Sequence, residues 1–173
     1  MSKFKNTFAS TRCEYNRIDK KCVLVIPIIL LFLGIFTRWV SGSPISTLHF
    51  LEIRDTVPPS WLMVILFGAF YIVSGLSLGT ALGNKYCANG EKKYQGAMWF
   101  CISLALGYAW YPLFFCARLF LVSMILSLVC FATSLFATLC FINVSKISFF
   151  LSLFSNCWLL YLLFLNMQIF FAI

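Results

Sequence analysis

Charged residues are scarce in this 173-residue sequence, where Lys, Arg, Asp and Glu together make up 10% of the chain. An ordinary soluble domain carries about 25% charged residues, so that class of protein is excluded. Long stretches carry no charge at all, namely 56–84, 94–117, 119–145, 147–173 and, shorter, 22–37. What fills them is apolar, since 62% of the residues are hydrophobic and 20 are phenylalanine.

Residues suited to acid–base or metal chemistry are equally few. The one histidine, His49, lies in a polar segment with Glu52, Arg54 and Asp55, and no acidic residue lies in an apolar stretch. A solvated loop histidine is favoured over a haem or metal ligand. There is no phosphate-binding loop, nucleophile elbow or zinc spacing, and the eight cysteines form no C-x-x-C pair. The sequence therefore favours a binding protein over an enzyme or an ion-driven pump, and predicts neither a metal site nor a required cofactor.

The apolar stretches predict membrane-spanning helices. A helix needs roughly 20 apolar residues to cross about 30 Å of hydrocarbon, and backbone groups in lipid must pair within the segment. The stretch at 22–37 is short, but Arg38 can extend to the interface and Trp39 can lie at headgroup level. We therefore predict an all-α integral membrane protein, a bundle of five transmembrane helices near 22–40, 58–82, 95–116, 119–142 and 147–171.

The basic residues are distributed unevenly along the chain. Ten lie in the tail 1–21 and in the segments after the second and fourth helices, whereas Arg38, Arg54 and Arg118 lie in the alternate segments. The positive-inside rule then makes 1–21 a basic cytoplasmic tail and puts the end of the membrane domain, 22–173, outside. A net charge of +8 could indicate a nucleic-acid partner. The placement of the basic residues instead favours a multi-pass protein of the plasma membrane (the inner membrane of a bacterium), in contact with the lipid bilayer.

Small and hydroxyl residues recur at helical spacing. They form a glycine row in the second helix, a small-residue row in the third and hydroxyl rows in the fourth and fifth: Gly75, Gly79, Gly83; Ala97, Cys101, Ala105, Ala109; Ser123, Ser127, Cys130, Ser134, Thr138; Ser148, Ser152, Ser155. Such rows let helices approach closely in lipid. We expect the glycine row to pack inside the bundle and the hydroxyl rows to face another helix or a cavity. For the third helix, internal packing and a homodimer seam both stay open.

Aromatic residues are the remaining chemical signal. The stretch LGYAWYPLFFCARL at 106–119 combines Trp110 with a proline and neighbouring aromatics, and Trp158 likewise lies well inside its apolar stretch. Rigid aromatic walls suit a flat apolar ligand, although any one of these side chains could instead face lipid or form an interfacial belt.

Three segments resemble the translocator protein family, also called tryptophan-rich sensory proteins (TspO/MBR). PPSWLMVILFGAFYIVSG at 58–75 is similar to the family's second-helix signature, with Phe67 standing where the family has a second tryptophan. LGYAWYPLFFCAR is similar to its third-helix signature, and NVSKISFFLSLFSNCWLLYLLFLN to its fourth connection and fifth helix. Several positions depart from the family pattern, so this is a divergent member: Thr47, Leu48, Gly107, Ser123, Phe154, Ser155 and Leu162.

The resemblance implies a dimeric five-helix bundle with a ligand pocket beneath the first loop. Family members bind porphyrins, haem and, in animals, cholesterol. A sterol motif is missing at the end of the fifth helix, and the pattern Leu82, Tyr86, Lys92 lies in a loop, so tetrapyrroles rank above sterols. The implied ligand-binding residues are Trp61, Phe67, Tyr71, Gly107, Trp110, Phe114, Trp158 and Leu162.

Under this hypothesis the protein binds or transports a flat hydrophobic ligand such as porphyrin or haem, with Arg38 or Arg54 available to its carboxylates. Two alternatives stay open: a structural or regulatory membrane protein that acts through dimer or partner contacts, and a porphyrin-degrading enzyme. Leu162 would project into the pocket where relatives keep a small residue, unless it contacts lipid instead.

Overall fold

Five long helices make up the described part of the protein. The computed structural model describes residues 18–41, 60–84 and 90–172, which contain no strand beyond an isolated bridge between Ile18 and Asn84. The helices are α2 (Lys20–Ser41), α4 (Ser60–Gly83), α5 (Gly90–Phe115), α6 (Phe120–Phe141) and α7 (Lys146–Ala172). Each is long and apolar enough to cross a membrane, which confirms the prediction of an all-α membrane protein with five spans.

The start of one helix differs from its expected position. α5 begins at Gly90 rather than near residue 95, and Glu91 in its first turn suits the positive end of the helix dipole. α4 begins at Ser60, so Pro58 and Pro59, which were expected in its first turn, lie outside the described residues. Pro112 lies inside α5, and the helix continues to Phe115 before the chain turns through Arg118, whose φ is 54°.

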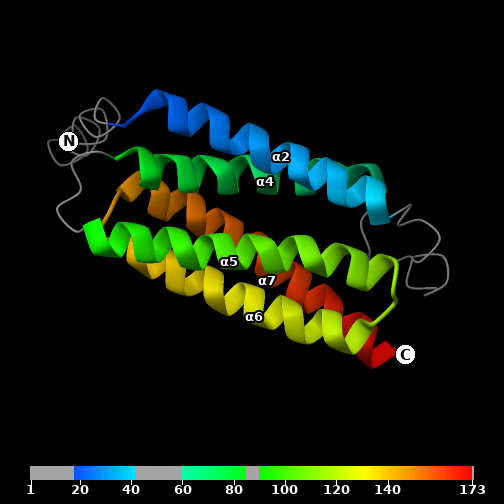
Figure 1. Ribbon diagram of the computed structural model, residues 1–173. Helices are drawn as coiled ribbons and strands as arrows, with labels where there is room; N and C mark the ends of the chain where they lie inside the picture. Colours follow the sequence, from blue (N-terminus) through cyan, green and yellow to red (C-terminus); the bar gives the residue numbers. More distant parts are fainter. Residues whose placement is uncertain (1–17, 42–59, 85–89, 173) are drawn as a thin grey trace, which may run out of the picture.

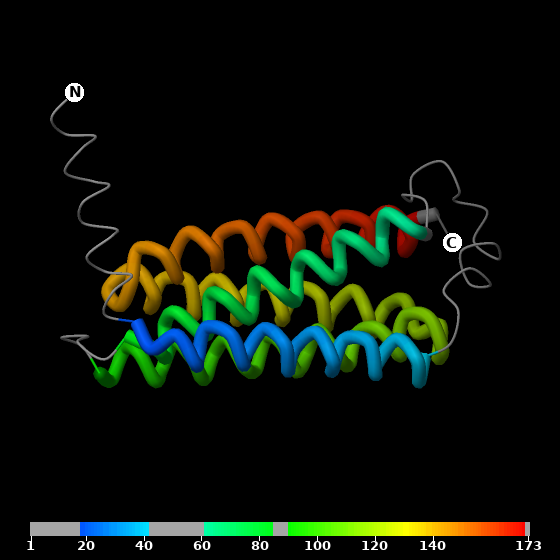
Figure 2. The backbone as a smooth tube through the Cα atoms, turned by 90° about the horizontal axis from the view of Figure 1, so that it is seen from above, coloured from blue at the N-terminus to red at the C-terminus, as the bar shows by residue number. Residues whose placement is uncertain are grey.

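The helices lie side by side, roughly along one common direction (Figures 1 and 2). Around the bundle the neighbours follow the order α2, α4, α7, α6, α5, and contacts between α5 and α2 close the ring. Short connections join α5 to α6 and α6 to α7, as expected for antiparallel neighbours. The bundle thus encloses an interior to which every helix contributes one face.

The glycine row of α4 packs directly on α2. A Cβ atom at Gly75 would overlap the backbone of Pro27, and one at Gly79 would lie 2.9 Å from the carbonyl oxygen of Cys22. Only glycine allows two helix backbones to come this close. The expectation that this row packs inside the bundle is therefore confirmed.

The hydroxyl rows form a buried polar seam between α4, α6 and α7. Ser74 and Ser155 bond through their hydroxyls at 3.0 Å, and the hydroxyls of Thr80 and Ser148 lie 2.7 Å apart. On the other side of α7, Thr138 of α6 is hydrogen-bonded to Ser152 and accepts from the Asn156 amide. These contacts confirm that the hydroxyl rows face neighbouring helices rather than lipid.

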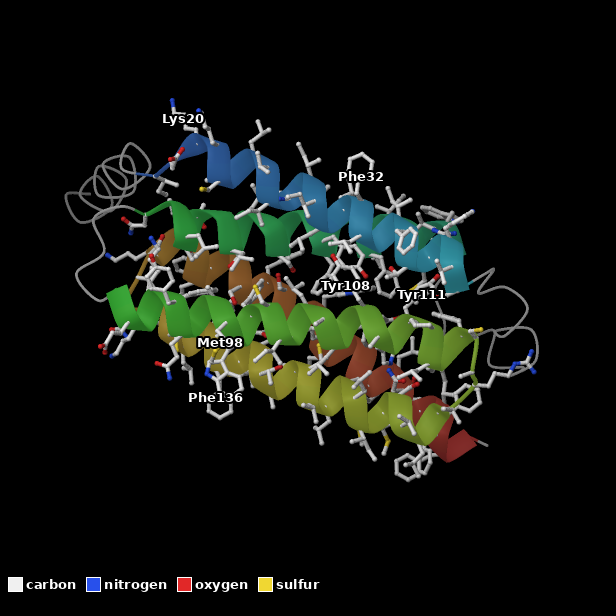
Figure 3. All side chains as sticks on the ribbon, in the orientation of Figure 1. Lys20, Phe32, Met98, Tyr108, Tyr111 and Phe136 are labelled. Carbon is white, nitrogen blue, oxygen red and sulfur yellow. The ribbon has the colours of Figure 1, made fainter. Side chains whose placement is uncertain are left out.

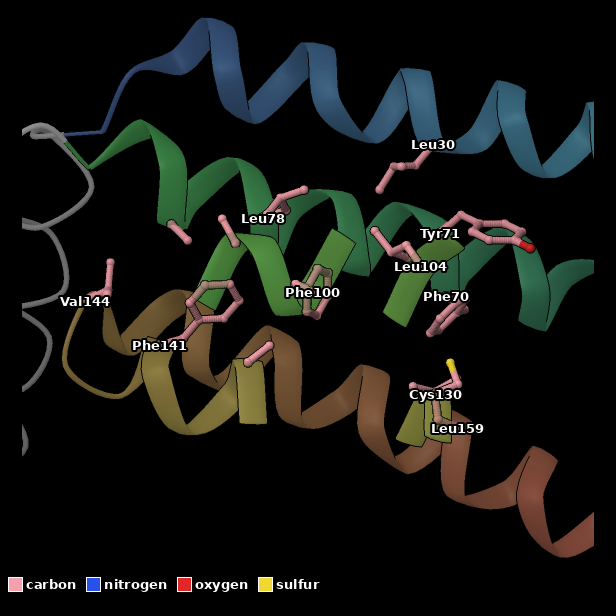
Figure 4. Packing of buried hydrophobic residues seen from close by; sticks show 13 residues of the cluster. Leu30, Phe70, Tyr71, Leu78, Phe100, Leu104, Cys130, Phe141, Val144 and Leu159 are labelled. Atoms are coloured by element: carbon pink, nitrogen blue, oxygen red, sulfur yellow. The ribbon is translucent and has the colours of Figure 1, made fainter. Parts of the chain in front are cut away.

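Apolar side chains occupy both the inside and the outside of the bundle. Figure 4 shows the buried cluster that runs from Val144 and Phe141 at one end towards Tyr71, Cys130 and Leu159. On the outside, Phe32 of α2 points away from the bundle and is 68% exposed (Figure 3). Exposed apolar side chains of this kind are the surface that a bilayer would cover.

Basic residues mark the two ends of the bundle. Lys20, Lys93 and Lys146 lie at the starts of α2, α5 and α7, and Lys93 donates to the carbonyl of Asn84 at 2.9 Å, beside the end of α4. At the opposite end, the described basic residues are Arg38 in the last turn of α2 and Arg118 after α5. The structure therefore keeps the charge asymmetry seen in the sequence.

Candidate functional site

A cavity of about 230 Å³, here called the outer cavity, lies between α2, α4 and α5. It is near the Arg38 end of the bundle, where α2 ends and α4 begins. Its lining residues are Leu31, Gly34, Ile35, Arg38, Met63, Val64, Phe67, Gly68, Tyr71, Tyr111 and Phe115. Among the described lining residues Arg38 alone is charged, so these residues form an apolar, aromatic space beside one guanidinium.

One wall of the outer cavity is built around Tyr71. Its ring stacks on that of Tyr108 with 5.1 Å between centroids and 10° between planes. The hydroxyl of Tyr108 donates to the carbonyl of Leu30 at 2.8 Å, which fastens α5 to α2. Figure 3 shows Tyr108 and Tyr111 in the space between these two helices. Stacking and hydrogen bonding together hold this wall in place.

A dense aromatic cluster lies behind the outer cavity. Trp110 is only 4% exposed and stacks on Phe114 at 5.0 Å. Its indole N–H donates to the Oδ1 atom of Asn166 at 3.3 Å, which pairs a group that would otherwise be buried without a partner. The rings of Tyr111 and Phe115 lie 4.7 Å apart and join the cluster to the outer cavity.

Phe67 stands between the outer cavity and this cluster. Its ring stacks with Trp110 at 6.3 Å and meets Trp158 edge-on at 5.3 Å. It also meets Tyr111 edge-on at 5.8 Å and stacks with Tyr71 at 6.5 Å. Among the described aromatic rings, only Phe67 contacts rings on three helices, α4, α5 and α7.

A second, much smaller space of about 20 Å³, here called the inner void, lies on the far side of Phe67. Its lining residues are Phe67, Phe70, Tyr71, Gly107, Trp110, Ser127, Cys130, Leu159 and Leu162. Phe67 and Tyr71 belong to both linings, so their side chains separate the two spaces. A space of this size is smaller than a single ligand ring and is close to that of one water molecule.

The structure distributes the predicted ligand-binding residues over these two spaces. Phe67 and Tyr71 line the outer cavity as well as the inner void. Gly107, Trp110 and Leu162 line the inner void but not the outer cavity, and Phe114 and Trp158 pack beside the inner void. Leu162 is 5% exposed, which rules out the alternative that it contacts lipid.

Trp61 is the exception, because the structure does not bring it to either space. It is 64% exposed and lines neither the outer cavity nor the inner void. Phe67 follows it by six positions, and at about 100° per residue the two side chains point some 120° apart around α4. Its position in the first turn of α4 instead suits an interfacial aromatic belt.

Several outer-cavity residues were not predicted from the sequence. Tyr111 and Phe115 are four residues apart on α5 and present one face to α2 and α4. Their spacing in LGYAWYPLFFCARL is the signal that could have identified them. Of the two arginines considered, Arg38 lines the outer cavity, whereas Arg54, like His49 and Tyr86, lies outside the described residues.

Three buried side-chain atoms in the described interior have no hydrogen-bond partner: the indole nitrogen of Trp158, the hydroxyl of Ser123 and the amide oxygen of Asn156. Ser123 has no exposed surface. Unpaired buried donors are uncommon in folded proteins. Trp158 and Ser123 occur at positions that the family resemblance had singled out.

The fold and the site together define a class of protein. It is a five-helix membrane bundle with an aromatic interior and a cavity beside Arg38. The family model described as the TspO/MBR family matches residues 23–172. Since the match covers nearly the whole chain, the protein belongs to this family. A comparison with curated proteins finds no match to this sequence.

Proposed function

We propose that the protein binds a flat hydrophobic molecule carrying a carboxylate, with tetrapyrroles ranked first, in the outer cavity. The observation that carries this proposal is the combination of four aromatic walls, Phe67, Tyr71, Tyr111 and Phe115, with the guanidinium of Arg38. Aromatic faces stack on a planar ring system, and a guanidinium pairs with a carboxylate through two parallel hydrogen bonds. Porphyrin and haem have both features, whereas a sterol has neither a planar aromatic system nor a carboxylate.

The outer cavity is also open towards the side that lipid would cover. Ile35 and Val64 belong to its lining and are 58% and 41% exposed. Its volume of about 230 Å³ is below the 300–1,000 Å³ common for drug-sized ligands. A bound tetrapyrrole would therefore fill the cavity and extend beyond it, and a hydrophobic ligand would enter from the bilayer.

A titration of the purified protein in nanodiscs tests this proposal. Protoporphyrin IX, haem and cholesterol would be added separately and read by quenching of tryptophan fluorescence. We expect saturable binding of the two tetrapyrroles, weakened roughly tenfold by Arg38→Gln because one charge-assisted pair is lost. Lys93→Gln, at the opposite end of the bundle, is the matched control. Absence of saturable binding to either tetrapyrrole would refute the proposal.

A second function, regulation through contacts with another copy or a partner, is favoured by one feature of α5. Cys101, Ala105 and Ala109 of its small-residue row are exposed, whereas Ala97 is buried. An exposed row of small side chains can seat a second helix in lipid. Cross-linking through Cys101 in membranes, lost on Ala105→Leu, would support a homodimer seam on this face.

A further inference from the structure

Phe67 closes the inner side of the outer cavity. It lines both spaces together with Tyr71, and the inner void beyond it is lined by Gly107, Trp110 and Leu162. A ligand held in the outer cavity therefore meets the Phe67 ring before it meets any of these three residues. Whatever fixes or frees that ring decides how deep a ligand can reach.

The two side chains that separate the spaces are held very differently. Tyr71 is buried at 7% exposure and stacks in parallel on Tyr108. The ring also meets α2, because a Cβ atom at Gly34 would overlap it. Phe67 is half-buried and has no polar side-chain atom, so packing alone holds its ring. Of the two, Phe67 is the one that a ligand can displace.

Space and an unused polar group lie behind Phe67. A Cβ atom at Gly107 would have only the Sγ atom of Cys130 within 4 Å, at 3.8 Å, so there is open room beside this residue. Trp158, whose ring meets Phe67 edge-on at 5.3 Å, carries the buried N–H without a hydrogen-bond partner. Turning the Phe67 ring away would join the inner void to the outer cavity and add the volume that the ring vacates.

We propose that Phe67 is the specificity-determining residue of this site and sorts ligands by size. A compact aromatic carboxylate binds in the outer cavity alone, whereas a macrocycle enters fully only when it displaces the Phe67 ring towards Gly107. This inference rests on the proposed function, because it concerns the depth of the same site. Displacing the ring therefore costs part of the binding free energy of a large ligand, whereas a small ligand binds without displacing it.

The test compares two ligands on matched variants in nanodiscs. Protoporphyrin IX is the large probe and 2-naphthoate, a two-ring carboxylate, is the compact one. Phe67→Ala removes the barrier and should tighten protoporphyrin binding roughly tenfold, whereas 2-naphthoate loses one stacking partner, gains no space that it needs and should bind more weakly.

Two glycine substitutions separate the two spaces. Gly107→Val fills the inner void, and Gly68→Val fills the outer cavity, where a Cβ atom has nothing within 4 Å. Both place valine in a helix, so their cost in helix propensity is the same. In the Phe67→Ala background, Gly107→Val should abolish the gain for protoporphyrin and leave 2-naphthoate unchanged, whereas Gly68→Val should weaken both ligands. Tryptophan fluorescence melting of each variant would check that it is folded.

The outcomes distinguish this inference from the proposed function. Suppose that protoporphyrin binds and Gly68→Val weakens it, but neither Phe67→Ala nor Gly107→Val changes its affinity. The ligand then stays outside Phe67, the inference is wrong, and the proposed function stands. If the unsubstituted protein binds neither ligand, the proposed function fails and the inference fails with it.

Discussion

The ring of Tyr71 lies directly on the backbone of Gly34, at the place where α4 meets α2. A side chain at position 34 would overlap the ring, which also stacks on Tyr108. A glycine on one helix and an aromatic residue on the next therefore define one wall of the outer cavity. The wall depends on both residues, and this leads to the first prediction.

Gly34→Ala should destabilise the protein by about 1–3 kcal/mol, because the added methyl group overpacks a wall that cannot move away. Gly68→Ala is the control, since a Cβ atom there has open space. In a Tyr71→Ala background the cost of Gly34→Ala should largely disappear, because the overlapping ring is gone. The free energy of unfolding in mixed detergent measures all three effects, and equal costs for Gly34→Ala and Gly68→Ala would show that the contact is unimportant.

Asn166 should matter through its bond to Trp110. Its Oδ1 atom accepts the indole N–H, and its amide donates to the carbonyl of Leu162 at 2.7 Å. Asn166→Leu keeps the size of the side chain but leaves a buried N–H unpaired, so we expect a loss of about 1–3 kcal/mol in the free energy of unfolding. Trp110→Phe removes that N–H and should make Asn166→Leu less costly. Strict additivity of the two substitutions would contradict this reading.

Hydroxyls of α6 offer a matched comparison within one helix. Thr138 bonds to Ser152 and Asn156 of α7, whereas the hydroxyl of Thr133 donates to carbonyls of its own helix, at Val129 and Cys130. Interhelical bonds of this kind contribute about 0.6 kcal/mol on average in membranes, and up to about 1.7. Thr138→Val should therefore destabilise the bundle by roughly 1 kcal/mol more than Thr133→Val. Thermal unfolding in nanodiscs measures the difference, and a larger loss for Thr133→Val would reverse the assignment.

Membrane orientation is a prediction that follows from charge. Lys20, Lys93 and Lys146 lie at one end of the bundle, and Arg38 and Arg118 lie at the other. We expect the lysine end in the cytoplasm, because basic segments are retained on that side. Cysteine labelling from outside intact cells, in a variant otherwise free of cysteine, should modify position 118 and not position 146. The opposite pattern would invert the topology.

Much of the architecture could be predicted from the sequence because the bilayer restricts the choices. Uncharged stretches long enough to span the membrane must form helices, so four of the five helices followed from charge spacing. The first, at 22–37, is shorter and also needed Arg38 and Trp39 at its end to be assigned as a span. The glycine row of α4 and the hydroxyl rows were assigned to helix contacts for a similar reason, since small and polar side chains gain little from facing lipid.

Residue type alone could not say which aromatic side chains surround a cavity and which fill a cluster. Trp61, Phe67 and Trp110 looked alike as apolar aromatics in the sequence, yet one is exposed, one separates two spaces and one is packed against Asn166. That difference depends on the rotation of each helix and on its distance from its neighbours. Both are set by non-local contacts such as Gly75 on Pro27 and Tyr108 on Leu30, and only the tertiary structure decides them, because the same side chain can pack against lipid, another helix or a ligand.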